Sequence, residues 1–181
     1  QLNCKKMKRN VLIFGVVLGS ILCANMIYMV NLCYNDPNFK SNDLVGYAAM
    51  VVIFSLIFFG VRNYRNKQLG GTITFGEAFK TGAFIALTGA TMYVVVWLFY
   101  YYLFVPDYLD KYIPLVLKET AQNSASELAA KTKEMENFKT MYKNPLFVIL
   151  ITYSEVLPVG LAVALISSLI LKKKKNMELR A

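Results

Sequence analysis

Histidine is absent from the 181-residue sequence, and cysteine occurs only three times. The absence of histidine removes the residue that most often serves as a catalytic base and as a zinc ligand. The cysteines, Cys4, Cys23 and Cys33, form no CxxC pair and are odd in number. We interpret them as packing residues. The sequence also offers no nucleophile–base pair, metal cluster or phosphate-binding loop, so we expect no enzyme activity, no metal and no cofactor.

Charged residues are nearly absent from four long stretches, and these stretches raise the mean hydropathy to +0.43. None contains Lys or Arg, and Glu155 is their only acid. About 20 apolar residues suffice for a helix to cross a bilayer, whereas helices of a soluble bundle need a polar face. We therefore predict an all-α integral membrane four-helix bundle, built as a single membrane domain over residues 1–181. The predicted spans cover about residues 11–33, 44–61, 82–103 and 146–171, with an outer helical insert at 104–144.

The net charge of +9 could indicate a nucleic-acid partner, but the positions of the charges argue against it. Thirteen of the twenty basic residues flank the apolar stretches on one predicted side of the membrane. They are Lys5, Lys6, Lys8 and Arg9, then Arg62, Arg65, Lys67 and Lys80, and finally Lys172, Lys173, Lys174, Lys175 and Arg180. Basic residues mark the cytoplasmic side of a membrane protein. We therefore expect both termini in the cytoplasm and no nucleic-acid partner.

Met7 is followed by Lys-Arg-Asn and then by the first apolar stretch, which is typical of a natural start. We therefore expect residues 1–6 to be upstream read-through or the edge of a fragment. A cleaved signal is the alternative, because Leu22-Cys23 resembles a lipoprotein processing site. However, a large residue precedes Cys23 where a small one is needed, and the apolar stretch continues to Val30. These features favour an uncleaved anchor.

Two capping boxes predict helix starts outside the apolar stretches. Thr74-Phe-Gly-Glu77 predicts that the third helix begins near Phe75. The aromatic end of that helix, residues 97–104, is typical of the belt that lies at a membrane interface. Ser124-Ala-Ser-Glu127 predicts a helix within the insert. We expect the insert to form a hairpin of two amphipathic helices, which either packs on itself and the lipid surface or binds a partner.

Small residues recur every four positions on three of the predicted spans. Such stripes allow helix backbones to approach closely in lipid. They either pack the spans of one chain against each other, which we favour, or form a dimer. The predicted contact residues are Gly15 and Gly19, Gly82 and Ala86, and Gly160 and Ala164.

Glu155 lies nine residues from the outer end of its predicted span, or about 14 Å along the helix. An ionisable group at this depth is costly and usually faces protein or water. Counting to a similar depth in the other spans reaches Asn25, Ser55 and Tyr93, which predicts a polar layer. Pro158 lies beside this layer and leaves a helical carbonyl without its N–H partner. Glu155 is either a structural hydrogen-bonding group or a proton or solute site.

Five segments carry motifs that extend beyond simple apolarity. They are Gly46–Met50, Phe58–Arg65, Gly70–Gly82, Tyr142–Leu146 and Glu155–Gly160. With these segments the chain resembles a bacterial family known as domain of unknown function 4199, and the similarity covers essentially everything after Met7. The glycine-rich Gly70–Gly82 motif is the most specific of them. The resemblance implies a small four-span inner-membrane protein with an outer insert, and it brings no established activity, substrate or cofactor.

We interpret the chain as a non-enzymatic inner-membrane protein, an envelope or assembly accessory factor. The alternative is a small transporter or channel subunit that uses Glu155. Besides the lipid bilayer, the expected partner is another protein or a second copy of the chain. Transport would require a water path to Glu155, whereas an accessory role would need only a partner surface, for which residues 107–143 are the first choice.

Overall fold

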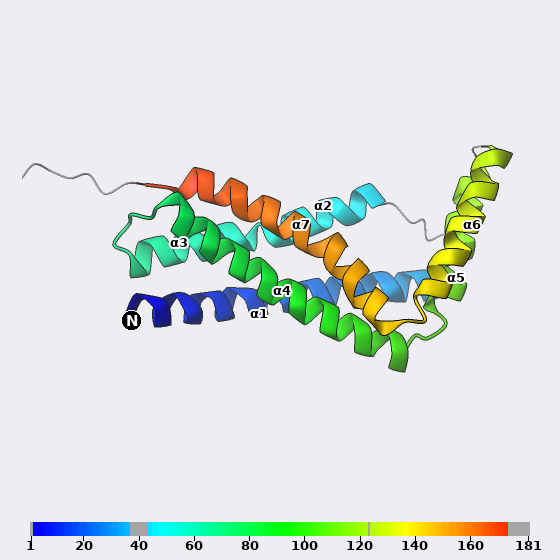
Figure 1. The fold of residues 1–181 in the computed structure, drawn as a ribbon, viewed down its shortest axis with the longest axis horizontal. Coiled ribbons are helices and arrows are strands. Elements are labelled where there is room, and N and C mark those ends of the chain that lie inside the picture. Colours follow the sequence, from blue (N-terminus) through cyan, green and yellow to red (C-terminus); the bar gives the residue numbers. More distant parts are fainter. Residues whose placement is uncertain (1, 37–42, 123, 174–181) are drawn as a thin grey trace, which may run out of the picture.

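The computed structural model describes residues 2–36, 43–122 and 124–173, which form seven helices (Figure 1). They are α1 (Leu2–Asn35), α2 (Asp43–Phe54), α3 (Leu56–Gln68), α4 (Phe75–Leu103), α5 (Tyr108–Thr120), α6 (Ala125–Met141) and α7 (Pro145–Leu171). Four stretches are long and apolar enough to cross a membrane, namely Lys5–Asn35, Leu44–Gln68, Phe75–Leu103 and Pro145–Leu171. The predicted all-α membrane bundle is confirmed. The basic residues Lys174, Lys175 and Arg180 lie outside the described residues.

The second span consists of two helices, α2 and α3, which meet at Ser55. The N–H of Ser55 donates to the carbonyl of Val51 at 3.0 Å, and the N–H of Phe58 donates to the carbonyl of Ser55 at 3.0 Å. The second bond spans only three residues, which tightens the chain locally. The Ser55 hydroxyl also donates to the carbonyl of Val52 at 2.6 Å, and such back-bonding bends helices. An apolar stretch that looks continuous in the sequence therefore contains a break.

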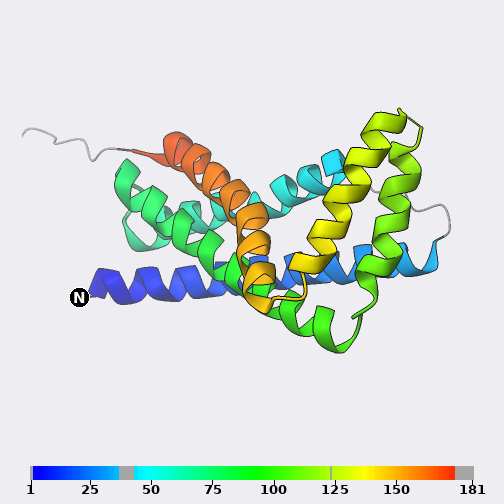
Figure 2. The same ribbon diagram turned by 45° about the vertical axis from the view of Figure 1, so that its right-hand side comes forward.

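Helix α4 lies at the centre of the bundle, between α1 and α7 (Figures 1 and 2). Helix α3 packs against all three of these helices near one end. The core that they share includes Leu18, Ile57 and Ile85, whose side chains are completely buried. Lipid tails are as apolar as these side chains, so burial alone gives little driving force for association. The closeness of the helix contacts therefore decides how firmly the bundle holds together.

Helices α1 and α4 approach closely where glycines face the neighbouring helix. A Cβ atom on Gly15 would lie 2.6 Å from the side chain of Thr88, and one on Gly89 would lie 2.8 Å from Leu18. A Cβ atom on Gly19 would lie 3.2 Å from the carbonyl oxygen of Gly89. These separations are shorter than van der Waals contact, so a larger residue would push the helices apart. Gly89 is part of this contact although the sequence pattern does not single it out.

Helices α4 and α7 meet through small residues in the same manner. A Cβ atom on Gly160 would lie 2.7 Å from the Phe54 ring and 2.9 Å from the Cβ atom of Ala86. A Cβ atom on Gly82 would lie 3.0 Å from the Cβ atom of Ala164. Small residues on both helices thus permit close backbone approach, which strengthens dispersion contacts in lipid. The stripes on these two spans face each other within one chain.

Helix α4 begins at Phe75, as the capping box predicts. The hydroxyl of Thr74 accepts the N–H of Glu77 at 3.3 Å, and the Glu77 carboxylate accepts the N–H of Thr74 at 3.1 Å. Helix α6 begins beside Ser124, whose hydroxyl accepts the N–H of Glu127 at 3.2 Å. Among the described residues, the returning bond of a full capping box is absent at Ser124. The second motif therefore acts as a simple N-cap.

The starts of α1 and α4 and the ends of α3 and α7 lie together at one end of the bundle, which we call the basic end (Figure 1). Gly70–Gly71 reverses the chain there with positive φ angles of 65° and 89°, which glycine adopts without strain. Nη1 of Arg65 donates to the carbonyl of Leu171 at 3.2 Å. The backbones of Ile73 and Lys173 exchange two hydrogen bonds of 3.0 and 2.9 Å. The loop before α4 is thereby attached to the end of α7.

Helices α5 and α6 lie side by side across the opposite end, which we call the hairpin end (Figures 1 and 2). Aromatic rings attach them to the bundle: Trp97 lies 5.4 Å from Tyr108, and Tyr101 lies 5.1 Å from Tyr142, between ring centroids. Trp97 and Tyr101 are only 7 % and 8 % exposed, whereas Phe99 is 60 % exposed. The predicted interfacial belt is therefore only partly correct. One face of this aromatic segment holds the hairpin instead.

A polar contact joins α5 to α1. The Tyr34 hydroxyl donates to the Asp107 carboxylate at 2.6 Å, and Nζ of Lys111 lies 3.8 Å from the same carboxylate. The Lys111 ammonium also lies 4.5 Å from the centre of the Tyr34 ring. The bond from Tyr34 is the main reason that the pKa of Asp107 is below its usual value, with Lys111 adding to the effect. The hairpin is therefore anchored to α1 as well as to α4.

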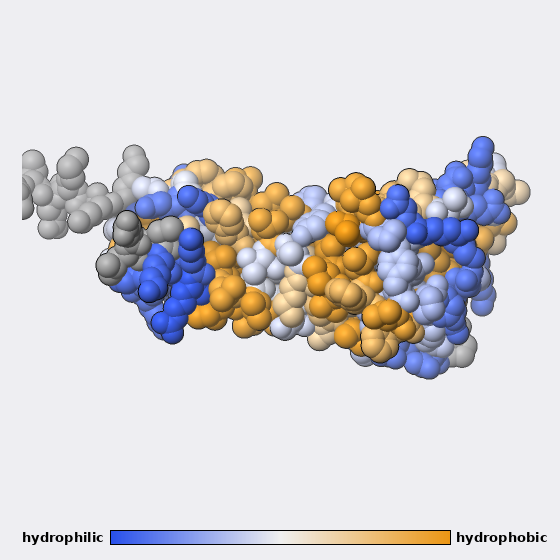
Figure 3. Space-filling model, turned by 60° about the horizontal axis from the view of Figure 1, so that its bottom comes forward, coloured by the Kyte–Doolittle hydropathy of each residue, from blue (hydrophilic) through white to orange (hydrophobic). Residues whose placement is uncertain are grey.

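Apolar side chains form a broad band between the two polar ends of the molecule (Figure 3). Large apolar residues are exposed on every span; examples are Leu12 at 61 %, Val52 at 70 %, Phe99 at 60 % and Ile170 at 64 %. A soluble monomer rarely exposes contiguous apolar surface on this scale. The band is therefore the surface that meets lipid.

We predict that Gly160→Leu lowers the melting temperature of the detergent-solubilised protein, because the new side chain would collide with Phe54 and Ala86. Overpacking of this kind costs about 1–3 kcal/mol. Gly46→Leu on α2 is the matched control, because a Cβ atom there meets nothing within 4 Å. Thermal unfolding of both variants beside the parent tests the prediction. Equal melting temperatures for Gly160→Leu and the parent would show that this contact does not hold the bundle together.

Candidate functional site

Glu155 is the only charged residue in α7 and lies ten residues after its first residue, Pro145. At 1.5 Å per residue this places it about 15 Å along the helix, near the middle of the apolar band. Its side chain is exposed in the isolated chain. The neighbouring residues Thr152 and Val156 are only 3 % and 1 % exposed. Glu155 therefore lies on the flank of the buried face of α7, and its surroundings make up the candidate site.

Two tyrosines lie within electrostatic range of the Glu155 carboxyl group. One is Tyr93 on α4, which is half-buried. The other is Tyr142, which is the residue after α6 and is buried. The packing of α4 against α7 supplies Tyr93, and the return of the hairpin to the membrane supplies Tyr142. The structure thus brings together Glu155 and Tyr93, two of the residues that the sequence assigns to a common depth.

Tyr142 connects the site to the hairpin end. Its hydroxyl accepts a hydrogen bond of 3.1 Å from Nε1 of Trp97 and lies against the hydroxyl of Thr152. Burial raises the pKa of Tyr142 to about 12; the Trp97 bond opposes this rise, and the Glu155 carboxylate adds to it. Tyr102 donates to the backbone carbonyl of Tyr142 at 3.0 Å. Polar groups thus continue from the hairpin end to the middle of the span.

A second polar contact joins α4 and α7 at a similar level. The Tyr153 hydroxyl donates to Oγ1 of Thr91 at 2.8 Å, and Oγ1 of Thr91 donates to the carbonyl of Leu87 at 2.7 Å. Interhelical hydrogen bonds of this type contribute roughly 0.6 kcal/mol on average in membranes. The α4–α7 contact therefore combines small residues with side-chain hydrogen bonds.

The other residues predicted in or beside the polar layer differ in their exposure and hydrogen bonding. Ser55 is exposed and bonds to its own helix at Val52, so its assignment to the layer is wrong. Asn25 is half-buried, and within the described part of the chain its side chain makes no hydrogen bond. Pro158 is exposed, and α7 continues through it without interruption. The candidate site therefore consists of Glu155, Tyr93 and, toward the hairpin end, the hydroxyl groups of Tyr142 and Thr152.

This arrangement has a limited chemical repertoire. A carboxyl group beside phenol and hydroxyl groups can donate or accept hydrogen bonds and can exchange a proton. Among the described residues, no cluster of three or more His, Cys, Asp or Glu side chains could hold a metal ion. The site is suited to recognition or proton exchange.

Thr152, Tyr142 and Trp97 are members of the site that the sequence reasoning missed. Thr152 precedes Glu155 by three residues, so it lies near Glu155 on the same side of a helix. The spacing of three residues could therefore have identified Thr152 as a member of the site from the sequence alone. Tyr142 and Trp97 are separated by 45 positions in the sequence. Their pairing depends on how the hairpin returns to the bundle, which no local pattern encodes.

Comparisons with known proteins give one finding. Searches of the curated proteins and of the solved structures return no match. A family model described as "Protein of unknown function (DUF4199)" matches residues 12–173. This region includes most of the first span, the whole of the other three, the hairpin and every residue of the candidate site. The chain therefore belongs to the DUF4199 family.

Proposed function

We propose that the protein is a non-enzymatic accessory factor of the bacterial inner membrane that associates laterally with another membrane protein through the surface around Glu155. The observation that carries the proposal is the exposed carboxyl group in the middle of a membrane-length helix. An acid at the centre of a span costs about 2.5–3.5 kcal/mol when it faces lipid. A neighbouring helix that covers Glu155 would shield it from lipid and so lower this cost.

The two tyrosines beside Glu155 support the same conclusion. Tyr93 lies on α4, which packs against α7, and Tyr142 lies in the connection that leads into α7, so the chain positions both before any partner arrives. Preorganised polar groups bind a partner with less ordering cost. The exposed remainder of the Glu155 side chain is the part available to a partner. An acid covered in this way specifies one neighbour over the many apolar helices of a membrane.

Transport is the second candidate, and one observation favours it. Trp97, Tyr142 and Thr152 place polar groups between the hairpin end and Glu155. A proton could follow such a series if water completed it, and intramembrane acids serve proton pathways in transporters. The accessory role requires only that Glu155 meet a donor. Transport requires in addition that the carboxyl group gain and lose a proton.

We further propose that both termini and the α3–α4 loop face the cytoplasm, because the basic residues gather at that end of the bundle. Single cysteines at Gln68 and Ser126 test this orientation in a chain whose native cysteines are replaced. A membrane-impermeant maleimide added to intact cells should label Ser126→Cys in the hairpin and leave Gln68→Cys unlabelled. Labelling of Gln68→Cys alone would invert the orientation. Permeabilised cells serve as the control, because both sites should react there.

We predict that Glu155→Gln retains the association and that Glu155→Leu weakens it. Glutamine keeps the size and hydrogen bonding of the acid, whereas leucine keeps neither. Loss of one intramembrane hydrogen bond of about 1 kcal/mol weakens binding of the partner about fivefold. Affinity purification of tagged protein from mild detergent, with quantitative mass spectrometry of what accompanies it, gives the measurement. Glu134→Leu in α6 is the control, because it also exchanges an acid for leucine but lies in the hairpin.

Proton flux into liposomes containing the purified protein separates the two candidates. An accessory factor should give no flux above that of empty liposomes, with parent and Glu155→Gln alike. A flux that the parent supports and Glu155→Gln abolishes would establish transport and contradict the accessory role. Equal recovery of partner with the parent and Glu155→Leu would show that Glu155 is not the contact.

A further inference from the structure

Charges of one sign dominate the basic end. Ten basic residues are described there, and nearly all of their side chains are exposed. They are Lys5, Lys6, Lys8, Arg9, Arg62, Arg65, Lys67, Lys80, Lys172 and Lys173. The only acid described at this end is Glu77, and its carboxylate already accepts bonds from the N–H and the hydroxyl of Thr74. The positive charge of this end is therefore left without compensation inside the described chain.

The hairpin end behaves differently. The three ion pairs of the described residues join Lys111 to Asp107, Lys131 to Glu134, and Lys139 to Asp110, and all of them involve α5 or α6. None involves a basic residue of the basic end. A basic group that pairs within its own chain has less charge to offer a partner, whereas unpaired groups attract external anions. The basic end is thus the part of the molecule that attracts anions most strongly.

The backbone at the basic end is held in a fixed arrangement. The bridge between Ile73 and Lys173 and the bond from Arg65 to the carbonyl of Leu171 tie the end of α7 to the α3–α4 connection. Lys172 and Lys173 therefore start from a fixed backbone beside Arg65. Contacts between segments 100 or more residues apart in the sequence thus bring the backbone before Lys172 close to the Arg65 side chain.

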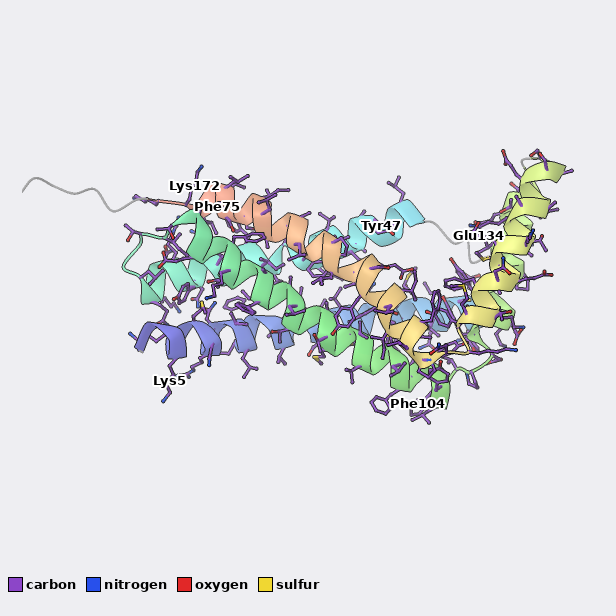
Figure 4. The ribbon with its side chains drawn as sticks, viewed as in Figure 1. Lys5, Tyr47, Phe75, Phe104, Glu134 and Lys172 are labelled. Carbon is purple, nitrogen blue, oxygen red and sulfur yellow. The ribbon has the colours of Figure 1, made fainter. Side chains whose placement is uncertain are left out.

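This cluster also lies at the level of the membrane surface. The apolar part of α7 ends at Leu171, directly before Lys172. Phe75 at the start of α4 is 39 % exposed and stacks on Phe79, with 6.1 Å between the ring centroids. In Figure 4, Lys5, Phe75 and Lys172 lie at one end of the bundle and Glu134 lies at the other. Aromatic rings beside lysines are typical of the lipid headgroup region.

We propose that the cluster of Arg65, Lys172 and Lys173 binds the phosphate headgroups of anionic phospholipids. The partner is a lipid, because the charges adjoin the apolar band where acyl chains lie, so one molecule can satisfy both surfaces. A basic side chain near an anionic bilayer strengthens binding about fivefold. The backbone that carries these charges is fixed before the lipid arrives. The cluster thus binds individual lipid molecules of the inner leaflet at a defined site, in addition to the long-range attraction between its positive charge and the anionic membrane surface.

Binding of phosphatidylglycerol and phosphatidylcholine to the full chain in a neutral detergent tests the proposal. Native mass spectrometry counts the lipids retained, and the melting temperature reports their effect on stability. The parent should retain phosphatidylglycerol and melt at a higher temperature with it, whereas phosphatidylcholine should have little effect. The double variant Lys172→Gln with Lys173→Gln should bind phosphatidylglycerol about 30-fold more weakly, since two charges are removed.

Lys118→Gln with Lys133→Gln is the matched control, because it removes two exposed charges from the hairpin that make no ion pair there. It should bind phosphatidylglycerol as the parent does. Lys172→Arg with Lys173→Arg should restore binding, and melting without lipid checks that each variant is folded. Equal affinity for both lipids, or equal losses in the two glutamine variants, would overturn the proposal. Equal stabilisation by inorganic phosphate, or tighter binding of a short oligonucleotide, would overturn it too.

Discussion

The close approach of α4 to α1 and α7 is the contact on which the rest of the structure depends. Helices in lipid associate through packing and hydrogen bonds, because the solvent is as apolar as their side chains. Gly89 and Gly160 permit that packing on the two sides of α4. The same approach brings Tyr93 within electrostatic range of Glu155, and Trp97 of the same helix bonds to Tyr142. A wider separation of these helices would therefore remove both the stability of the bundle and the geometry of its polar site.

The features that depend on residues close together in the sequence could be predicted from the sequence. The four spans follow from apolar length, and the start of α4 at Phe75 follows from the Thr74–Glu77 capping box. Ser55 shows where such reasoning stops, because one hydroxyl that bonds to Val52 divides a span whose apolar pattern is continuous. A helix break of this kind depends on which backbone carbonyl groups accept hydrogen bonds from Ser55, and the amino-acid composition of the span does not predict this.

The polar layer is a prediction of depth, and depth alone does not decide which residues meet. Counting residues gives the depth of a side chain, since each residue advances the helix by 1.5 Å, but successive side chains also rotate by about 100°. Ser55 and Tyr93 can therefore share a level and face different neighbours. Rotation is set by the packed face, and for α7 that face includes Thr152 and Val156. Tyr142 arrives from the hairpin, so only the three-dimensional path of the chain could place it beside Glu155.

The charged residues are distributed differently at the two ends of the molecule. At the hairpin end, lysines pair with acids of the same hairpin, and such exposed pairs contribute little to stability. Their effect is to cancel the field at that end, whereas the basic end keeps its field because ten basic residues are described there beside one acid, Glu77. An uncompensated field extends about 8 Å into solution at physiological ionic strength, far enough to meet an anionic leaflet. The unequal pairing of charges therefore makes the two ends of the bundle electrostatically distinct, with a strong positive field at one end only.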